Sequence, residues 1–84
     1  MLLRHEIGDA LRQLRQERWL TLRDVSAKSS VALGYLSEVE RGTKEVSSEV
    51  LNSILSALDL ELDEFIWLLY RQMSKTSLEP LSLV

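Results

Sequence analysis

The sequence has no cysteine among its 84 residues, only three glycines and one proline, and no long apolar run. Without cysteine the chain can form no disulfide, no thiolate nucleophile and none of the usual structural zinc sites. No apolar segment approaches the ~20 residues that cross a bilayer, and the N-terminus lacks the basic-then-apolar order of a signal peptide. We therefore expect a cytoplasmic protein with no membrane partner.

Groups that support catalysis are also scarce. His5 is the only histidine and lies near one terminus, where its side chain is expected to be solvated. The carboxylates show no metal-ligand grouping, the serines lack a plausible base, and no glycine-rich phosphate loop is present. These absences predict a protein that is not an enzyme and that holds neither a metal nor a cofactor.

Charge is unevenly divided along the chain. The net charge is -3, but residues 1–44 hold eight Lys or Arg against six Asp or Glu, whereas residues 45–84 hold two against seven. A net acidic balance argues against nucleic acid as a partner. The basic charge nevertheless lies in the first half, and the acidic half can face away. DNA binding stays open, with few phosphate contacts and marked salt dependence expected.

Apolar residues recur at three- and four-residue spacing in five segments, which predicts five helices and no strand. These helices are expected over about 4–18, 21–28, 33–41, 47–58 and 62–73. One domain over 1–73 is expected, because cores divide only in much longer chains. Residues 74–84 lose the periodicity and contain Pro80, so they are expected to form a flexible C-terminal tail.

Local signals around the second and third helices are of mixed strength. Thr21 is a preferred N-cap, and Asp24 three residues later can complete a capping box. Trp19 occupies a position where a left-handed glycine would be comfortable, at a cost of about 1 kcal/mol. Ala32 stands where an N-cap Ser or Thr is expected, whereas Gly42 is well suited to end the third helix.

The strongest functional signal lies in the third helix. Its aliphatic side chains form an inward stripe, and its outward face is small and partly polar. That outward face consists of Leu33, Gly34, Ser37, Glu38 and Arg41. Two short helices joined by a tight turn over about 22–41, the second of them slim, form the outline of a helix-turn-helix DNA reader.

The order of capping residues, turn, Tyr35, the Glu40-Arg41-Gly42 run and a capped fourth helix resembles the Cro and phage-repressor (XRE) family. The runs Leu-Thr-Leu-Arg-Asp-Val-Ser-Ala and Leu-Gly-Tyr-Leu-Ser-Glu-Val-Glu-Arg-Gly are most similar to the actinobacterial regulators of Clp protease genes, the ClgR type. This resemblance implies an all-α, five-helix, lambda-repressor-like DNA-binding domain. It also implies an ion pair between Arg15 and Glu40 that ties the first helix to the third.

Membership of that family further implies a homodimeric transcription activator of Clp protease and related proteolysis genes. RNA polymerase is then an implied partner of the activator. Clp protease, acting on the C-terminal tail, is another.

The N-terminal residues of the third helix are expected to enter the major groove of double-stranded DNA. Base contacts are expected from Leu33, Gly34, Ser37 and Glu38, and Glu38 can accept a hydrogen bond from cytosine N4. Phosphate contacts are expected from the start of the second helix and from the region around the third. The residues expected to make them are Thr21, Arg23, Tyr35, Arg41, Thr43 and Lys44.

The segment 62–73 carries more apolar side chains than one small domain can bury, so the surplus is expected to form a homodimer interface. The residues expected there are Phe65, Ile66, Trp67, Leu69, Tyr70 and Met73. A two-fold dimer would place its recognition helices about one DNA turn apart on a pseudo-palindromic operator. The alternative is a protein-interaction adaptor or antitoxin-like subunit that binds through this helix without reading DNA, which the acidic pI and the bland Leu33-Gly34 favour.

Overall fold

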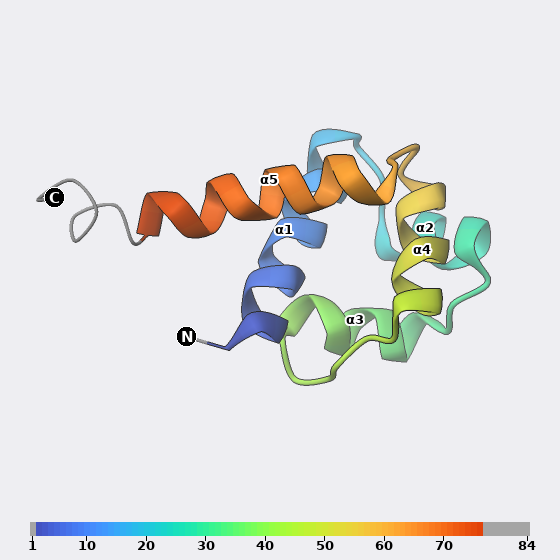
Figure 1. Ribbon diagram of the computed structural model, residues 1–84. Helices are drawn as coiled ribbons and strands as arrows, with labels where there is room; N and C mark the ends of the chain where they lie inside the picture. The colour runs from blue at the N-terminus through green and yellow to red at the C-terminus, as the bar shows by residue number, and fades with distance from the viewer. Residues whose placement is uncertain (1, 77–84) are drawn as a thin grey trace, which may run out of the picture.

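The computed structural model describes residues 2–76, and within that range it contains five helices and no strand. The helices are α1 (Leu3–Glu17), α2 (Leu22–Ser29), α3 (Leu33–Arg41), α4 (Ser48–Ala57) and α5 (Leu62–Thr76). α1 packs against α3 and α5, α2 packs against α3 and α4, and α4 also contacts α5. Figure 1 shows α3 and α5 on opposite sides of the molecule, with α1 and α4 between them. The all-α, five-helix prediction is confirmed.

The helix boundaries lie close to those predicted, except at the end of the chain. α5 continues through Thr76 and so extends past the expected end at residue 73. Figure 1 shows the end of α5 projecting beyond the other helices. The rest of the predicted tail, 77–84, lies outside the described residues.

Capping side chains explain why α2 and α4 begin where they do. The Thr21 hydroxyl accepts a hydrogen bond from the Asp24 amide at 3.0 Å, and the Thr21 amide donates to the Asp24 carboxylate at 2.8 Å. Ser47 similarly accepts a hydrogen bond from the Val50 amide at 3.2 Å. α3 begins at Ala32 without a side-chain cap, as expected from the missing hydroxyl.

Within residues 2–76, three non-glycine residues adopt left-handed backbone conformations at helix ends. Trp19 follows α1 with φ +57°, Ser30 follows α2 with φ +62°, and Asp59 follows α4 with φ +58°. Trp19 is the position where the sequence favoured a glycine, and the structure shows that the side chain is accommodated by pointing into solvent.

An apolar core joins the five helices of residues 2–76. Its members are Ala10, Leu11, Leu14, Val25, Val31, Leu36, Val39, Leu51, Ile54, Leu55, Ala57, Leu58, Phe65 and Leu69. The N-terminal part of α1 approaches the C-terminal end of α3 closely at Gly8, which has no side chain to separate the two backbones. The core therefore fixes the back of α3 and leaves its front uncovered.

Candidate nucleic-acid interface

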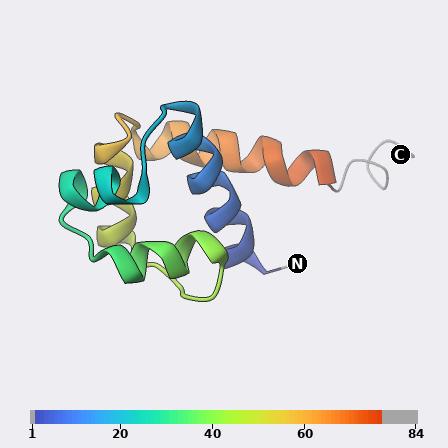
Figure 2. The same cartoon turned by 180° about the vertical axis from the view of Figure 1, so that it is seen from behind.

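A shallow open groove lies where the N-terminal ends of α2 and α3 meet. It has a volume of about 600 Å³ and is lined by Thr21, Leu22, Arg23, Leu33, Gly34 and Ser37. We call it the reading groove. It brings together three of the expected base-contact residues and two of the expected phosphate-contact residues. Figure 2 shows α2 and α3 from the side opposite to Figure 1, with α3 along the lower edge of the molecule.

The capping box determines what Thr21 can offer at this groove. Its amide hydrogen is used by Asp24, and its hydroxyl oxygen accepts from the Asp24 amide. The hydroxyl hydrogen can still be donated outward, because accepting a bond uses only an oxygen lone pair. The hydrogen bond from the Thr21 amide lowers the pKa of the Asp24 carboxyl, because it stabilises the charged carboxylate.

Gly34 lies on the open front of α3. A Cβ atom built at this position would meet nothing within 4 Å, so the glycine is not required by packing inside the monomer. Ser37 and Glu38 follow one turn further along the helix and are partly exposed. Among residues 2–76, therefore, nothing covers α3 at Gly34, and the other positions where base contacts were expected, Leu33, Ser37 and Glu38, are partly exposed.

Two expected phosphate donors are engaged within the chain instead. The Tyr35 hydroxyl donates to the Glu45 carbonyl at 2.8 Å. The Thr43 amide and hydroxyl both donate to the Glu38 carbonyl, at 3.0 and 3.1 Å. Phosphate oxygens need donors, and these hydrogens already close the loop after α3. In this structure Tyr35 and Thr43 therefore order the loop, and their expected phosphate contacts, which would require these hydrogen bonds to be exchanged, stay predictions.

Arg41 and Lys44 lie beyond the reading groove, at the C-terminal end of α3 and in the following loop. Both side chains are exposed, as is Arg23 at the start of α2. Cations thus lie at both ends of the open front of α3. That placement is compatible with two separate contacts to a DNA backbone.

Arg15 and Glu40 form a two-pronged ion pair between α1 and α3. Arg15 Nε lies 2.7 Å from Glu40 Oε2, and Arg15 Nη2 lies 3.0 Å from Glu40 Oε1. Arg15 Nη1 also donates to the Leu20 carbonyl at 2.8 Å. The hydrogen bond with Glu40 raises the pKa of Arg15 above its ordinary value. The arginine therefore links α1, α3 and the α1–α2 turn.

Comparison with known proteins decides the family. A family model described as "Helix-turn-helix" matches residues 11–65, which include the reading groove and the ion pair. The chain belongs to the helix-turn-helix family.

Two relatives refine this assignment. The helix-turn-helix chain is 54% identical over 61 residues to the transcriptional regulator ClgR of Mycobacterium tuberculosis, covering 73% of this chain and 54% of that protein. The crystal structure of the clp gene regulator ClgR from Corynebacterium glutamicum superposes with a TM-score of 0.84 at 41% identity, covering 98% of this chain and 88% of that one. The predicted resemblance to ClgR-type regulators is confirmed. The chain spans about half the length of the Mycobacterium relative.

A more distant neighbour shares the fold alone. The restriction-modification controller protein C.Esp1396I, crystallised as a tetramer with its natural 35 base-pair operator, superposes with a TM-score of 0.80 at 22% identity. That match covers 84% of this chain and 93% of that one. The two ClgR relatives are named as a transcriptional regulator and a clp gene regulator, which agrees with the prediction that the chain is not an enzyme.

The α5 surface of the helix-turn-helix protein differs from the expected dimer interface in part. Phe65 and Leu69 are 0% and 6% exposed, because they face the monomer's own core, so they cannot form an interface between folded monomers. Met73 is partly buried and packs against the same core. Trp67 and Tyr70 are 58% and 60% exposed, and their rings stack with centroids 5.9 Å apart.

Ile66 is exposed beside these two rings, and Leu62, one turn earlier, is exposed as well. Leu62 was missing from the expected interface, although its four-residue spacing from Ile66 was visible in the sequence. We call Leu62, Ile66, Trp67 and Tyr70 the α5 apolar face.

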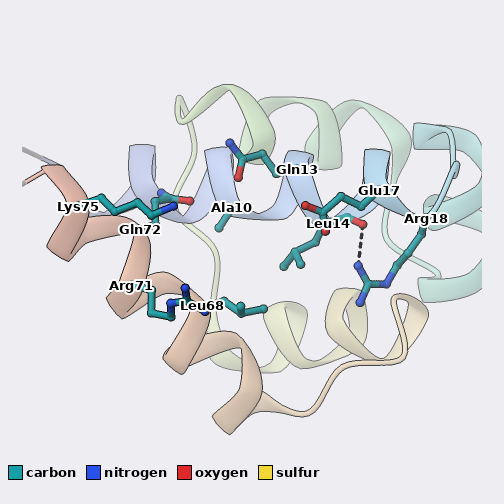
Figure 3. A pocket seen from close by; sticks show the side chains of 9 residues that line it. All are labelled: Ala10, Gln13, Leu14, Glu17, Arg18, Leu68, Arg71, Gln72 and Lys75. Carbon is teal, nitrogen blue, oxygen red and sulfur yellow. Dashed lines mark hydrogen bonds between the residues drawn. The ribbon is translucent and has the colours of Figure 1, made fainter.

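A second groove lies between α1 and α5, away from the reading groove. Figure 3 shows its floor of Ala10, Leu14 and Leu68, with polar side chains from both helices around it. Arg18, at one end, donates to the Leu14 and Leu58 carbonyls, both at 2.9 Å.

Among residues 2–76, no cluster of His, Cys, Asp or Glu is suited to hold a metal ion. No helix in the described part of the chain is long and apolar enough to cross a membrane.

Proposed function

We propose that this protein is a sequence-specific DNA-binding transcriptional regulator that binds a pseudo-palindromic operator as a homodimer, with α3 in the major groove. We further propose that it activates genes of Clp protease and related proteolysis functions. The latter rests on the relatives described as ClgR and as a clp gene regulator. RNA polymerase is then the partner that an activator must contact.

One observation carries the proposal: the front of α3 is open while its back is fixed by the core. Leu33, Gly34 and Ser37 line the reading groove beside Thr21 and Arg23 from the start of α2. A helix must be uncovered and narrow at its front to enter the major groove, and a neighbouring helix start can hold the phosphate backbone. The same fold occurs with operator DNA in C.Esp1396I.

The front residues differ in what they offer to a base. Leu33 can make apolar contact with a thymine methyl group, and Gly34 permits close approach of the backbone. Ser37 can donate or accept, whereas the Glu38 carboxylate accepts only, which matches the N4 amino group of cytosine. Thr21, Arg23, Arg41 and Lys44 are proposed to hold the flanking phosphates. The positive charge comes from Arg23, Arg41 and Lys44, so binding should weaken as salt rises, with a log–log slope proportional to the number of phosphates that these residues neutralise.

Replacing Gly34 with alanine tests this function without weakening the fold. Because nothing lies within 4 Å of the added methyl group, and alanine is the better helix former, stability should rise by about 0.5–1 kcal/mol. The methyl group would hold the α3 backbone away from the base edges, so affinity for the selected operator should fall by about tenfold. Operators are first selected from a random duplex pool, and affinity is then measured by salt-graded mobility shift.

Asn52→Ala on the exposed side of α4 is the matched control, and it should bind as the wild type does. Unchanged operator affinity in the Gly34 variant would exclude α3 as the reading element. If the wild type bound no duplex at any salt concentration, the alternative would be favoured, namely an adaptor or antitoxin-like subunit that uses the α5 apolar face.

Glu38→Ala tests base readout separately from affinity for the backbone. If Glu38 accepts from cytosine N4, the variant should lose about 1–3 kcal/mol of discrimination at one position of each half-site and keep its other preferences. Selection from the same random pool, followed by sequencing of the bound sites, measures this directly. An unchanged preference at every position would assign Glu38 to solvent instead.

The α5 apolar face is proposed as the homodimer interface, because stacked and exposed aromatic side chains are typical anchors of such surfaces. Tyr70→Glu should place a charge among these side chains and shift the chain from dimer to monomer, while Asn52→Glu on α4 should not. Analytical ultracentrifugation over a range of concentrations measures the shift. A wild-type protein that stays monomeric at high concentration would contradict the dimer.

Activation is proposed on the relatives' descriptions and is tested by transcription in vitro. Addition of the protein to RNA polymerase and a promoter of a Clp protease gene should raise transcript yield, and the Gly34→Ala variant should raise it less. A fall in yield would instead identify a repressor.

The proposal that Clp protease acts on residues 74–84 is tested by comparing the cellular lifetimes of chains with and without those residues.

A further inference from the structure

The α1–α2 turn presents a tryptophan to solvent in a backbone conformation that disfavours it. Trp19 is 91% exposed, more than the other large hydrophobic side chains on the described surface, and its φ is +57°. Glycine adopts this conformation freely, whereas residues with a Cβ are disfavoured there. Neither packing within the monomer nor backbone preference accounts for a tryptophan at this position. Such a residue points to a role at the surface.

The turn that carries Trp19 is held from several sides. The Trp19 amide donates to the Gln16 carbonyl at 3.0 Å, and the Leu20 amide donates to the Arg15 carbonyl at 3.2 Å. Arg15 Nη1 returns a bond to the Leu20 carbonyl at 2.8 Å. The same arginine is paired with Glu40 of α3. The indole therefore projects from a backbone that is fixed relative to α3, the proposed reading helix.

The surface around Trp19 adjoins the reading groove at the start of α2. Trp19 lines a shallow hollow of about 450 Å³ together with Arg15, Gln16, Leu20, Thr21 and Leu22. Thr21 and Leu22 also line the reading groove. The two depressions are thus neighbours at the start of α2, and a ligand that extends from the reading groove past Thr21 comes to the hollow that Trp19 lines.

We propose that Trp19 extends the DNA interface onto the sugar–phosphate backbone that flanks each half-site. An indole carries one N–H donor and no charge, on a flat apolar ring. Its N–H donates to a phosphate oxygen while the ring covers a deoxyribose, next to the phosphate held by Thr21. This inference rests on the proposed function and deepens it, because it names a neutral contact outside the base-reading helix.

A partner protein is the other class of ligand for an exposed tryptophan. The position of Trp19 favours DNA, since its hollow adjoins the reading groove and shares two lining residues with it. The exposed apolar side chains of the α5 apolar face line neither depression. A protein that filled the hollow beside Trp19 would also cover Thr21 and Leu22 at the start of α2, where DNA is proposed to lie.

Trp19→Gly separates a binding role from a structural one. Glycine suits the left-handed φ, so the thermal midpoint of the variant should equal or exceed that of the wild type. Affinity for the selected operator should fall about tenfold, as expected for a lost hydrogen bond to a charged phosphate. The factor should be the same at low and high salt, because a neutral donor releases no counterion. Lys44→Ala should instead reduce the salt slope by about one for each subunit of the bound dimer.

A direct probe uses fluorine NMR of the protein labelled with fluorotryptophan. The chain has two tryptophans, and the Trp19 signal is assigned by its absence from the Trp19→Gly variant. Saturating operator duplex should shift this signal and shield it from a paramagnetic quencher. The effect should disappear when the duplex is trimmed to end at the outer edges of its half-sites.

Two negative outcomes have different meanings. If the wild type binds operator but Trp19→Gly binds equally well and the Trp19 signal does not move in the complex, the inference is overturned and the proposed function stands. If the wild type binds no duplex, the proposed function is overturned and the inference with it.

Discussion

Replacing Gly8 with alanine is expected to destabilise the protein by about 3 kcal/mol, although the same change in an open helix is favourable. A Cβ atom at Gly8 would lie 2.5 Å from the Val39 carbonyl oxygen and 2.6 Å from that of Glu40. Both obstacles are backbone atoms in the last turns of α3, so no side-chain rotation can relieve the overlap. α1 and α3 would have to separate, and the packing of Leu11 and Val39 between them would be lost.

Gly34→Ala is the matched control for this prediction, because both glycines lie inside helices and only one faces a neighbour. The two variants should move in opposite directions in urea denaturation followed by circular dichroism. A chain of this size has a total stability of roughly 4–12 kcal/mol, so a loss of about 3 kcal/mol should lower the urea midpoint of the Gly8 variant by a quarter or more. Equal stability of the two variants would show that α1 and α3 are not in contact at Gly8.

The same contact has a consequence for DNA binding. The back of α3 is held by α1 at Gly8, so any separation of these helices tilts the reading helix relative to the start of α2. A fraction of Gly8→Ala protein that remains folded should therefore bind operator more weakly than its folded population alone explains. Correcting measured affinity for the folded fraction, taken from the denaturation curve, isolates this effect.

Local signals in the sequence were sufficient to predict the helices that carry the site. The Thr21–Asp24 capping box, the glycine that ends α3 and the slim front of α3 all depend on residues within one or two turns of each other. Such short-range patterns fix where a helix begins and which of its faces is apolar. These signals were enough to predict residues on both sides of the reading groove, because the groove is formed by two helix starts separated by a short turn.

Contacts between residues far apart in the chain were harder to predict from the sequence. An apolar pattern along α5 shows that several faces are apolar, but it does not show which one meets α1 and α4. Phe65 and Leu69 were therefore assigned to the interface although they lie in the core. Likewise, nothing in the sequence indicates that the loop after α3 brings the Glu45 carbonyl within 2.8 Å of the Tyr35 hydroxyl. The close approach at Gly8 was missed for the same reason.

Removing Arg15 is the second large effect expected. Arg15→Ala should cost about 3–5 kcal/mol, because it leaves the Glu40 carboxylate uncompensated in a site where the Glu40 side chain is only 7% exposed. The Leu20 carbonyl would lose its partner as well. Glu40 raises the pKa of Arg15, so the stabilising charge on the arginine is fully present below its ordinary pKa and is lost only in strong alkali. The loss on mutation should therefore be seen at neutral pH.

Arg12→Ala is the matched control, because Arg12 also lies on α1 and pairs with Asp9, but at 3.9 Å and in solvent. Such an exposed pair contributes about 0–1 kcal/mol, so this variant should unfold close to the wild-type midpoint. Equal losses for Arg12→Ala and Arg15→Ala would show that the Arg15–Glu40 pair is not buried in solution.

The double variant Arg15→Met/Glu40→Leu then separates stability from orientation. Replacing both partners of a buried pair with apolar residues of similar size is often neutral or stabilising, so much of the single-variant loss should be recovered. The two-pronged geometry that aligns α3 with α1 and the α1–α2 turn would still be missing. If the pair serves mainly to orient the reading helix, the double variant should be stable yet bind operator more weakly than the wild type. Wild-type affinity in that variant would show that aliphatic packing alone is enough to aim α3 at DNA.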